Sequence, residues 1–245
     1  YRSMKRMDWP GIDQLDSEPQ YLMDHEKLPI ARLAASFADI SGEQESFTEF
    51  SDHTSRMENK QIGIDWIYSS VNWHFALGIN NFTSYYNFSA FTKEQIQKLN
   101  TYTARLGFLL RQGKRNSRVA LLYPEATIWA TYTPSVLERA RDFSEATLKV
   151  ENAFRDISWE LLERQIDYDY VDEMLIQEGE VKNGCLCYKD REYKSVVLPA
   201  VKILNRKTME KLEQLLDSGI GVIFAGEMPS LERETGNPCD FPVNM

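Results

Sequence analysis

Two carboxylates in the first half of the chain follow short segments with the composition of β-strands. Glu49 comes at the end of an expected strand over 44–50, and Asp13 comes at the end of another strand that runs into a Pro10-Gly11 turn. The C-terminal ends of strands are where (β/α) barrels hold their catalytic groups. A carboxylate at such a position can accept or donate a proton during a reaction. The spacing therefore predicts a barrel enzyme with an acidic site, and Glu49 is its catalytic candidate.

Three other side chains are candidates for binding a substrate beside these carboxylates. Trp9 precedes the first strand end, His53 follows Glu49 closely, and Tyr85 follows the next expected strand. Structural roles stay open for the two acids: Glu49 as an ion-pair partner at the barrel rim, and Asp13 as a turn residue that bonds the backbone.

The elements that would position these residues alternate between strand and helix. Apolar residues at helical spacing predict helices, with glycines at 42, 78 and 113 as terminators. Thr92 is expected to be the N-cap of the longest one. The expected helices of the first half cover 30–40, 60–77 and 93–112, and a strand with its loop covers 79–86.

The second half is predicted to be a separate domain after a polar, basic break at 114–118. Continuous apolar runs there are typical of strands buried on both faces of a parallel sheet. We expect strands over 119–124, 168–171, 185–188, 194–198 and 221–226, and helices over 146–165 and 206–217. A turn at Asp190-Arg191 is expected to join the third and fourth strands. The pattern predicts an open, mostly parallel doubly wound sheet.

Composition excludes some partners. The 245-residue chain has a net charge of −9 and no basic block to offset it, which argues against binding to nucleic acid. No apolar run reaches the roughly 18 residues of a membrane-spanning helix. No sequence pattern predicts a dinucleotide or a metal site, and the oligomeric state is left undefined.

Several short motifs, in order, resemble the glycoside hydrolases of family 106, the α-L-rhamnosidase family. P-G-I-D at 10–13 resembles a strand end of that family, and T-E-F at 48–50 resembles its S-E-x-F strand end. The run N-W-H-F-A-L-G-I-N at 72–80 is similar to its D-W-x-x-x-L-G-V-N signature. The run from Ala104 to Gly113 is similar to its A-R-L-x-x-L-L-x-Q-G helix. The resemblance covers most of residues 7–226.

This resemblance implies an α/β fold: the last βα units of a (β/α)8 barrel over 1–115, then an incomplete flavodoxin-like domain over 116–245. It implies a bacterial, exo-acting, α-L-rhamnosidase-like hydrolase that acts on glycans by an inverting, two-carboxylate mechanism. Only Glu49 matches a catalytic position of the family, so its partner is expected upstream of Tyr1. Asp13 is expected to contact sugar hydroxyls. The resemblance suggests a periplasmic or extracellular location. It also implies a structural calcium ion, which some members of the family contain.

Two alternatives stay open. The first is a retaining, β-galactosidase-like enzyme, in which Glu49 is the nucleophile and stands about 5–5.5 Å from its partner carboxyl. The second is an inactive homologue that binds glycans. Two departures from the family put the sugar in question: Tyr85 stands where histidine is frequent, and Arg32 stands where lysine is frequent.

Overall fold

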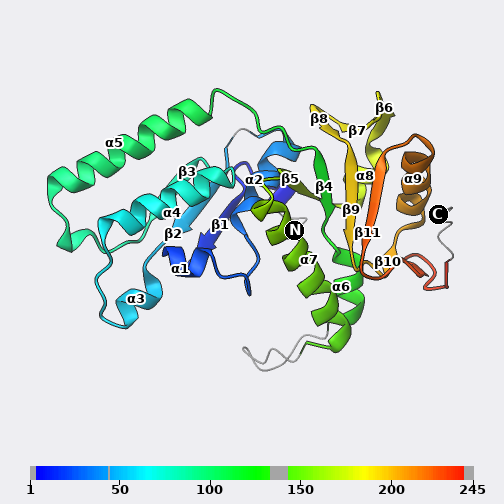
Figure 1. Cartoon of the computed structure of the whole chain (residues 1–245), viewed down its shortest axis with the longest axis horizontal. Helices are drawn as coiled ribbons and strands as arrows, with labels where there is room; N and C mark the ends of the chain where they lie inside the picture. The colour runs from blue at the N-terminus through cyan, green and yellow to red at the C-terminus, as the bar shows by residue number, and fades with distance from the viewer. Residues whose placement is uncertain (1–3, 44, 133–142, 240–245) are drawn as a thin grey trace. The chain divides into compact units, whose positions relative to one another are not determined.

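The computed structural model describes residues 4–43, 45–132 and 143–239. The chain divides into two compact units, Tyr1–Arg115 and Asn116–Met245, and Figure 1 shows the elements of each.

The first unit is built on a small parallel sheet. Its strands are β1 (Gly11–Gln14), β2 (Phe47–Phe50) and β3 (Asn81–Ser84), in the order β1-β2-β3. All three strands are parallel. In their register, Ile12 is the partner of Thr48, and Thr48 is the partner of Phe82. Of the strand predicted over 44–50, position 44 lies outside the described residues, and the strand begins at Phe47 rather than earlier in the described part.

Helices connect these strands and end close to the predicted positions. Gly42 ends α2 in a left-handed conformation, with φ 89°, which a glycine adopts without strain. Thr92 caps α5 as predicted, and Gln95 completes a capping box with it. The helical segments are η1 (Met4–Arg6), α1 (Pro19–Leu22), α2 (Ala31–Ser41), α3 (His53–Met57), α4 (Ile64–Ala76), η2 (Phe88–Ala90) and α5 (Lys93–Leu110).

An apolar cluster on one face of the sheet holds this unit together. Phe50 from β2 packs there with side chains of α4 and α5, and the Phe50 and Phe82 rings lie 5.2 Å apart. Its buried members are Phe50, Ile62, Ile67, Val71, Phe75, Tyr86 and Leu99. Alternate residues of a strand point to opposite faces, so Glu49 points away from this cluster.

The second unit is a doubly wound parallel sheet, as predicted. Its strands are β4 (Val119–Leu122), β5 (Tyr168–Val171), β9 (Ser195–Pro199) and β11 (Gly221–Ala225). They lie in the order β11-β9-β4-β5 and are all parallel. Numbered along the chain, this is the order 2-1-3-4 of a flavodoxin-like sheet.

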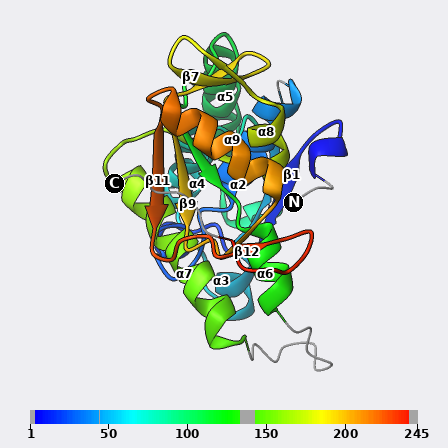
Figure 2. The ribbon, with the colours of Figure 1, turned by 90° about the vertical axis from the view of Figure 1, so that its right-hand side faces the viewer.

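Helices flank this sheet: α6 (Glu125–Thr131) packs with α7 (Glu145–Glu163), and α8 (Glu173–Glu178) packs with α9 (Arg206–Asp217). The helix α9 packs against β11, and Figure 2 shows it crossing in front of this sheet. Two further short strands, β10 (Ile203–Leu204) and β12 (Leu231–Glu232), pair with each other.

The turn predicted at Asp190-Arg191 is displaced by one residue, and a short strand follows it that the sequence did not predict. Arg191 begins a strand, β8 (Arg191–Tyr193), which pairs with β7 (Cys185–Tyr188) in an antiparallel sheet that also contains β6 (Glu180–Lys182). The turn covers Lys189 and Asp190, and Lys189 has φ 52°. A three-residue strand is too short to give a periodic signal in the sequence.

The predicted α/β class is confirmed by these parallel sheets and connecting helices. Among the described residues, no helix has both the length and the apolar character needed to cross a membrane.

Candidate functional site

A row of polar residues crosses the sheet of the first unit near the C-terminal ends of its strands. Asp13, Glu49 and Thr83 are the penultimate residues of β1, β2 and β3, and they are register partners. Register partners in a parallel sheet share a face, and neighbouring strands lie about 4.8 Å apart. Asp13 and Thr83 are exposed, whereas Glu49 is half-buried between them. The row therefore presents two carboxylates and a hydroxyl on the face opposite the apolar cluster.

An aromatic ring fills the layer below this row. Phe47 lies two residues before Glu49 and so points to the same face. Its ring covers Gly11, where any β-carbon would collide with it. Only glycine leaves room for the ring at this place, and the ring closes the N-terminal side of the polar row.

Two of the predicted binding residues lie in loops at the same edge of the sheet. His53 begins α3 directly after β2, and Tyr85 follows β3 with 56% of its surface exposed. The C-terminal ends of parallel strands meet at one edge, so the structure brings both loops to the edge where Asp13 and Glu49 lie.

Trp9 lies elsewhere. It precedes Pro10 and the first residue of β1, with 58% of its surface exposed. This position is at the N-terminal edge of the sheet, whereas Asp13 is near the C-terminal edge. The first strand starts only at Gly11, so Trp9 lies before it and not beside its C-terminal end. The structure therefore does not bring Trp9 together with the other predicted site residues.

Arg56 joins the two loops, and sequence reasoning missed it. Its Nη2 donates to Asp52 Oδ1 at 2.9 Å and to the backbone oxygen of Tyr85 at 2.6 Å. Asp52 is buried and precedes His53. Asp16, from the loop after β1, accepts a hydrogen bond from Thr54 N at 3.0 Å. The loops after all three strands are thus fixed relative to one another.

A buried polar network supports these loops from below. The Tyr86 hydroxyl lies 3.2 Å from Ser17 O and 3.0 Å from Ser70 Oγ and shares its one proton between these acceptors, and Ser70 Oγ donates to Ser17 O. Burial, with smaller contributions from the charges of Glu18 and Asp52, raises the pKa of Tyr86 well above its usual value. Tyr86 therefore remains a neutral donor and ties the loop after β1 to α4.

His74 and Glu18 are fully buried next to this network. A His74 ring nitrogen, Nδ1, lies 2.8 Å from Ser70 O, and burial lowers the pKa of His74 to about 4. The imidazole is therefore neutral at pH 7 and is structural, as its place inside the α4 pattern indicates. Neither carboxylate oxygen of Glu18 has a hydrogen-bond partner within the described residues. The sequence around Glu18 is polar and looks like an exposed loop, so it carries no signal of this burial.

The family resemblance implies a structural calcium ion in some members. The described residues contain no set of ligands that matches it. Within 4–43, 45–132 and 143–239, no three His, Cys, Asp or Glu side chains are grouped so that they could hold a metal ion. We therefore assign no step to a metal.

The chain is similar in structure to solved glycoside hydrolases. A rhamnosidase from Novosphingobium sp. PP1Y matches with a TM-score of 0.59 and 16% identity, over 94% of this chain and 22% of that chain. A catalytic mutant of a GH42 β-galactosidase from G. stearothermophilus matches with a TM-score of 0.61 and 15% identity, over 97% and 35%. An apo GH42 exo-carrageenase from Bacteroides ovatus matches with a TM-score of 0.54 and 12% identity, over 87% and 28%.

These similarities establish the fold. The predicted architecture, βα units of a glycosidase-type barrel followed by a flavodoxin-like parallel sheet, is confirmed. The chain spans between 22% and 35% of the length of these structures. No family model matches the sequence, and no curated protein matches it.

Proposed function

We propose that this chain is part of a glycoside hydrolase. In this proposal residues 1–115 form the last βα units of the catalytic barrel, residues 116–245 form the accessory flavodoxin-like domain, and Glu49 is one of the two catalytic carboxylates. The observation that carries the proposal is the row Asp13–Glu49–Thr83 on the face opposite the apolar cluster, close to the C-terminal strand ends. Barrel enzymes hold their active sites at this edge.

The roles follow from what hydrolysis of a glycosidic bond requires. One carboxyl group must protonate the leaving oxygen, and a carboxylate must take a proton from the attacking water. We assign Glu49 the second role: water adds to the anomeric carbon, its proton passes to Glu49, and the other carboxyl group gives its proton to the leaving oxygen. The carboxyl group that protonates the leaving oxygen is not among the residues to which this proposal gives a role.

The remaining residues have binding roles in this proposal. Asp13 accepts hydrogen bonds from sugar hydroxyls, because it is exposed and lies one strand away from Glu49. His53 and Tyr85 form the rim, and Arg56 positions them. Trp9 has no role in the site, because it lies at the other edge of the sheet. The substrate class we favour is a terminal α-L-rhamnosyl or related deoxyhexosyl residue of a complex glycan, on the strength of the motif resemblance.

A retaining, β-galactosidase-like enzyme is the second candidate. The adjacent register of Asp13 and Glu49 favours it, since the two strands lie about 4.8 Å apart and a retaining pair stands about 5–5.5 Å apart. In that case Glu49 attacks the anomeric carbon while the glycosidic bond breaks and the partner carboxyl group protonates the leaving oxygen; water, deprotonated by that partner, then releases the sugar from the covalent intermediate.

The test is hydrolysis of 4-nitrophenyl glycosides by the intact protein that carries this chain, with α-L-rhamnoside and β-D-galactoside in the panel. Glu49→Gln is expected to lower kcat by about 10²- to 10⁴-fold, the usual contribution of an acid–base group. Glu43→Gln is the matched control, because Glu43 is exposed and precedes β2. The anomer first released, followed by NMR, separates the inverting from the retaining mechanism. Full activity of Glu49→Gln, or no hydrolysis of any glycoside, would contradict the proposal.

A further inference from the structure

We infer that Thr83 is a further substrate-binding residue, whose hydroxyl group bonds one sugar hydroxyl on the side of Glu49 opposite Asp13. The inference rests on the proposed function and deepens it, since it names the contact that fixes the orientation of the sugar ring over Glu49.

The Thr83 side chain points to the face of the sheet that carries the two carboxylates. Its neighbours on the strand, Phe82 and Ser84, line a cavity that residues of α5 also line, and Thr83 is not among the residues around that cavity. Phe82 packs against the apolar cluster, with its ring 5.2 Å from that of Phe50. Because adjacent residues of a strand point to opposite faces, Thr83 lies on the face of Glu49, its register partner.

Within the described residues, the fold makes no use of the Thr83 hydroxyl. Asn81, two residues earlier on β3, is engaged: its Oδ1 accepts from Arg111, and its Nδ2 donates to Asn80 Oδ1 at 3.0 Å. The Thr83 side chain is exposed, and its hydroxyl makes no hydrogen bond to any residue of the described ranges. It is therefore available to a ligand.

The two acids of the polar row are available in the same way. In the part of the chain that the structure describes, neither the Asp13 nor the Glu49 carboxylate makes a hydrogen bond or an ion pair. Three adjacent strands thus present three polar side chains, all on one face and all without partners among the described residues. A ligand with several hydroxyl groups can bond all three at once.

The spacing of the strands fits one sugar ring. Asp13 and Thr83 lie on the strands on either side of Glu49. Neighbouring strands are about 4.8 Å apart, so the backbones at Asp13 and Thr83 are separated by about 10 Å. This width leaves room for a single pyranose ring that bonds a side chain at each end, with Glu49 beneath it.

The two flanking side chains offer different hydrogen bonds. A carboxylate such as Asp13 only accepts, whereas the Thr83 hydroxyl both donates and accepts. One sugar hydroxyl can therefore donate to Asp13, while another on the opposite side of the ring bonds Thr83. A sugar that is epimeric at the carbon beside Thr83 cannot make the second bond. Thr83 thus selects the configuration at that carbon.

The position of Thr83 is firmly held on both sides along the strand. The Phe82 ring before it packs 4.9 Å from the Phe75 ring of α4. After it, the backbone oxygen of Tyr85 accepts a hydrogen bond from Arg56 at 2.6 Å. Threonine is also stiff at χ1, because its Cβ is branched. A contact that is preset in this way binds a ligand at a lower entropic cost.

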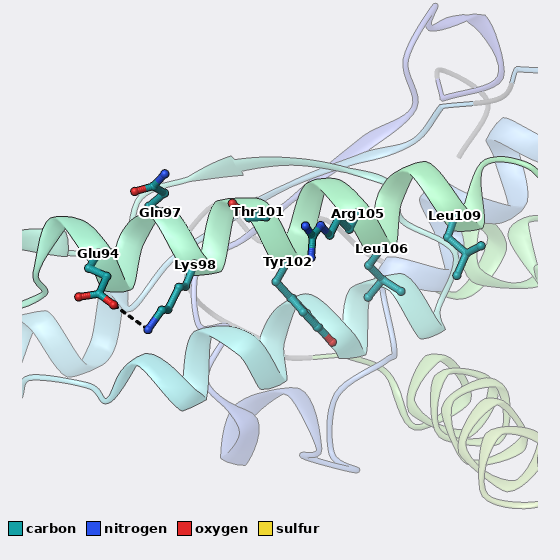
Figure 3. A pocket seen from close by; sticks show the side chains of 8 residues that line it. All are labelled: Glu94, Gln97, Lys98, Thr101, Tyr102, Arg105, Leu106 and Leu109. Atoms are coloured by element: carbon teal, nitrogen blue, oxygen red, sulfur yellow. Dashed lines mark ion pairs between the residues drawn. The ribbon is translucent and has the colours of Figure 1, made fainter.

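The test measures kcat/KM of the intact protein that carries this chain, with its best 4-nitrophenyl glycoside and with analogues that each lack one ring hydroxyl. Thr83→Val removes the hydroxyl and keeps the shape of the side chain, and Thr83→Ser keeps the hydroxyl. Thr101→Val is the matched control, because Thr101 is exposed on α5, where Figure 3 shows it in the row of side chains from Glu94 to Leu109. Thermal unfolding checks that each variant is folded.

We expect Thr83→Val to lower kcat/KM for the complete substrate about tenfold, since hydrogen bonds to sugar hydroxyls strengthen in the transition state. Thr83→Ser should recover most of this loss, and Thr101→Val should behave as the wild type. With the one analogue that lacks the bonded hydroxyl, Thr83→Val and the wild type should have equal kcat/KM.

Two outcomes would overturn the inference while the proposed function stands. The first is an equal loss in Thr83→Val with every analogue, because the role of the residue would then be structural. The second is an unchanged kcat/KM in Thr83→Val when the wild type is active. A wild-type protein that hydrolyses no glycoside would instead refute the proposed function, and the role of Thr83 with it.

Discussion

The Phe47 ring lies over Gly11, on the same face of the sheet as Glu49. This contact sets the layer beneath the polar row, and it requires the absence of a side chain at Gly11.

Gly11→Ala is therefore expected to destabilise the protein by about 1–3 kcal/mol, the usual cost of an overpacked contact, because Phe47 must move. Urea unfolding at fixed pH measures the change. Gly113→Ala serves as the control, since a β-carbon there meets no atom closer than 4.0 Å. Adding Phe47→Leu to Gly11→Ala should restore part of the loss. Equal stability of Gly11→Ala and wild type would show that the ring does not need the glycine.

Tyr86→Phe tests the buried network under the loops. The change removes a hydroxyl that lies within hydrogen-bond distance of Ser17 O and Ser70 Oγ, while it keeps the ring against Phe50. We expect a loss of about 1–2 kcal/mol, because a buried acceptor is left without its partner. Tyr102→Phe is the comparison: its hydroxyl bonds Asn72 near the surface, so its loss should be much smaller. A similar cost for both variants would argue against the network.

The long helices of this chain were predictable because their signals are local. The apolar spacing, Gly42 and Thr92 located α2 and α5 to within one or two residues. The register of Asp13 with Glu49 could not be read from the sequence, because pairing depends on contacts between residues 36 positions apart. The same holds for Arg56, whose role appears only when the loops after β2 and β3 meet. Trp9 was misplaced because a four-residue strand has boundaries too weak to read.

The stability of the protein should fall as the pH drops, because His74 titrates. The pKa of this buried imidazole is lowered from 6.5 to about 4, so the unfolded state binds more protons between those values. The neutral His74 imidazole makes its full contribution to the free energy of unfolding above pH 6.5. This contribution falls by at most about 3 kcal/mol as the pH drops to 4. Thermal unfolding from pH 7 to 4 should show a flatter pH dependence for His74→Gln. His25→Gln, which removes an exposed imidazole, is the control variant.

Arg56→Lys tests whether the joined loops position a substrate. Lysine keeps the charge but cannot reproduce the planar group that serves Asp52 and the Tyr85 backbone together. If the proposed function holds, KM for the best 4-nitrophenyl glycoside should rise about three- to tenfold, the equivalent of one lost hydrogen bond, with a smaller change in kcat. Arg164→Lys, at an exposed ion pair in the second unit, is the matched control. Unchanged KM would make the link purely structural.

Glu173 caps a helix of the second unit from a neighbouring element. Its Oε2 accepts from Asn205 N at 2.7 Å and from Thr208 Oγ1 at 2.6 Å, at the start of α9, whereas the Asn205 side chain makes no capping bond. The helix N-terminus also favours a negative charge. Glu173→Gln should therefore destabilise the second unit by about 1–2 kcal/mol, in the range of a lost cap. Hydrogen exchange of α9 peptides should locate the effect, and it should be absent in Glu210→Gln, where the carboxylate is exposed on the same helix. Faster exchange in both variants would mean that net charge, rather than the cap, stabilises α9.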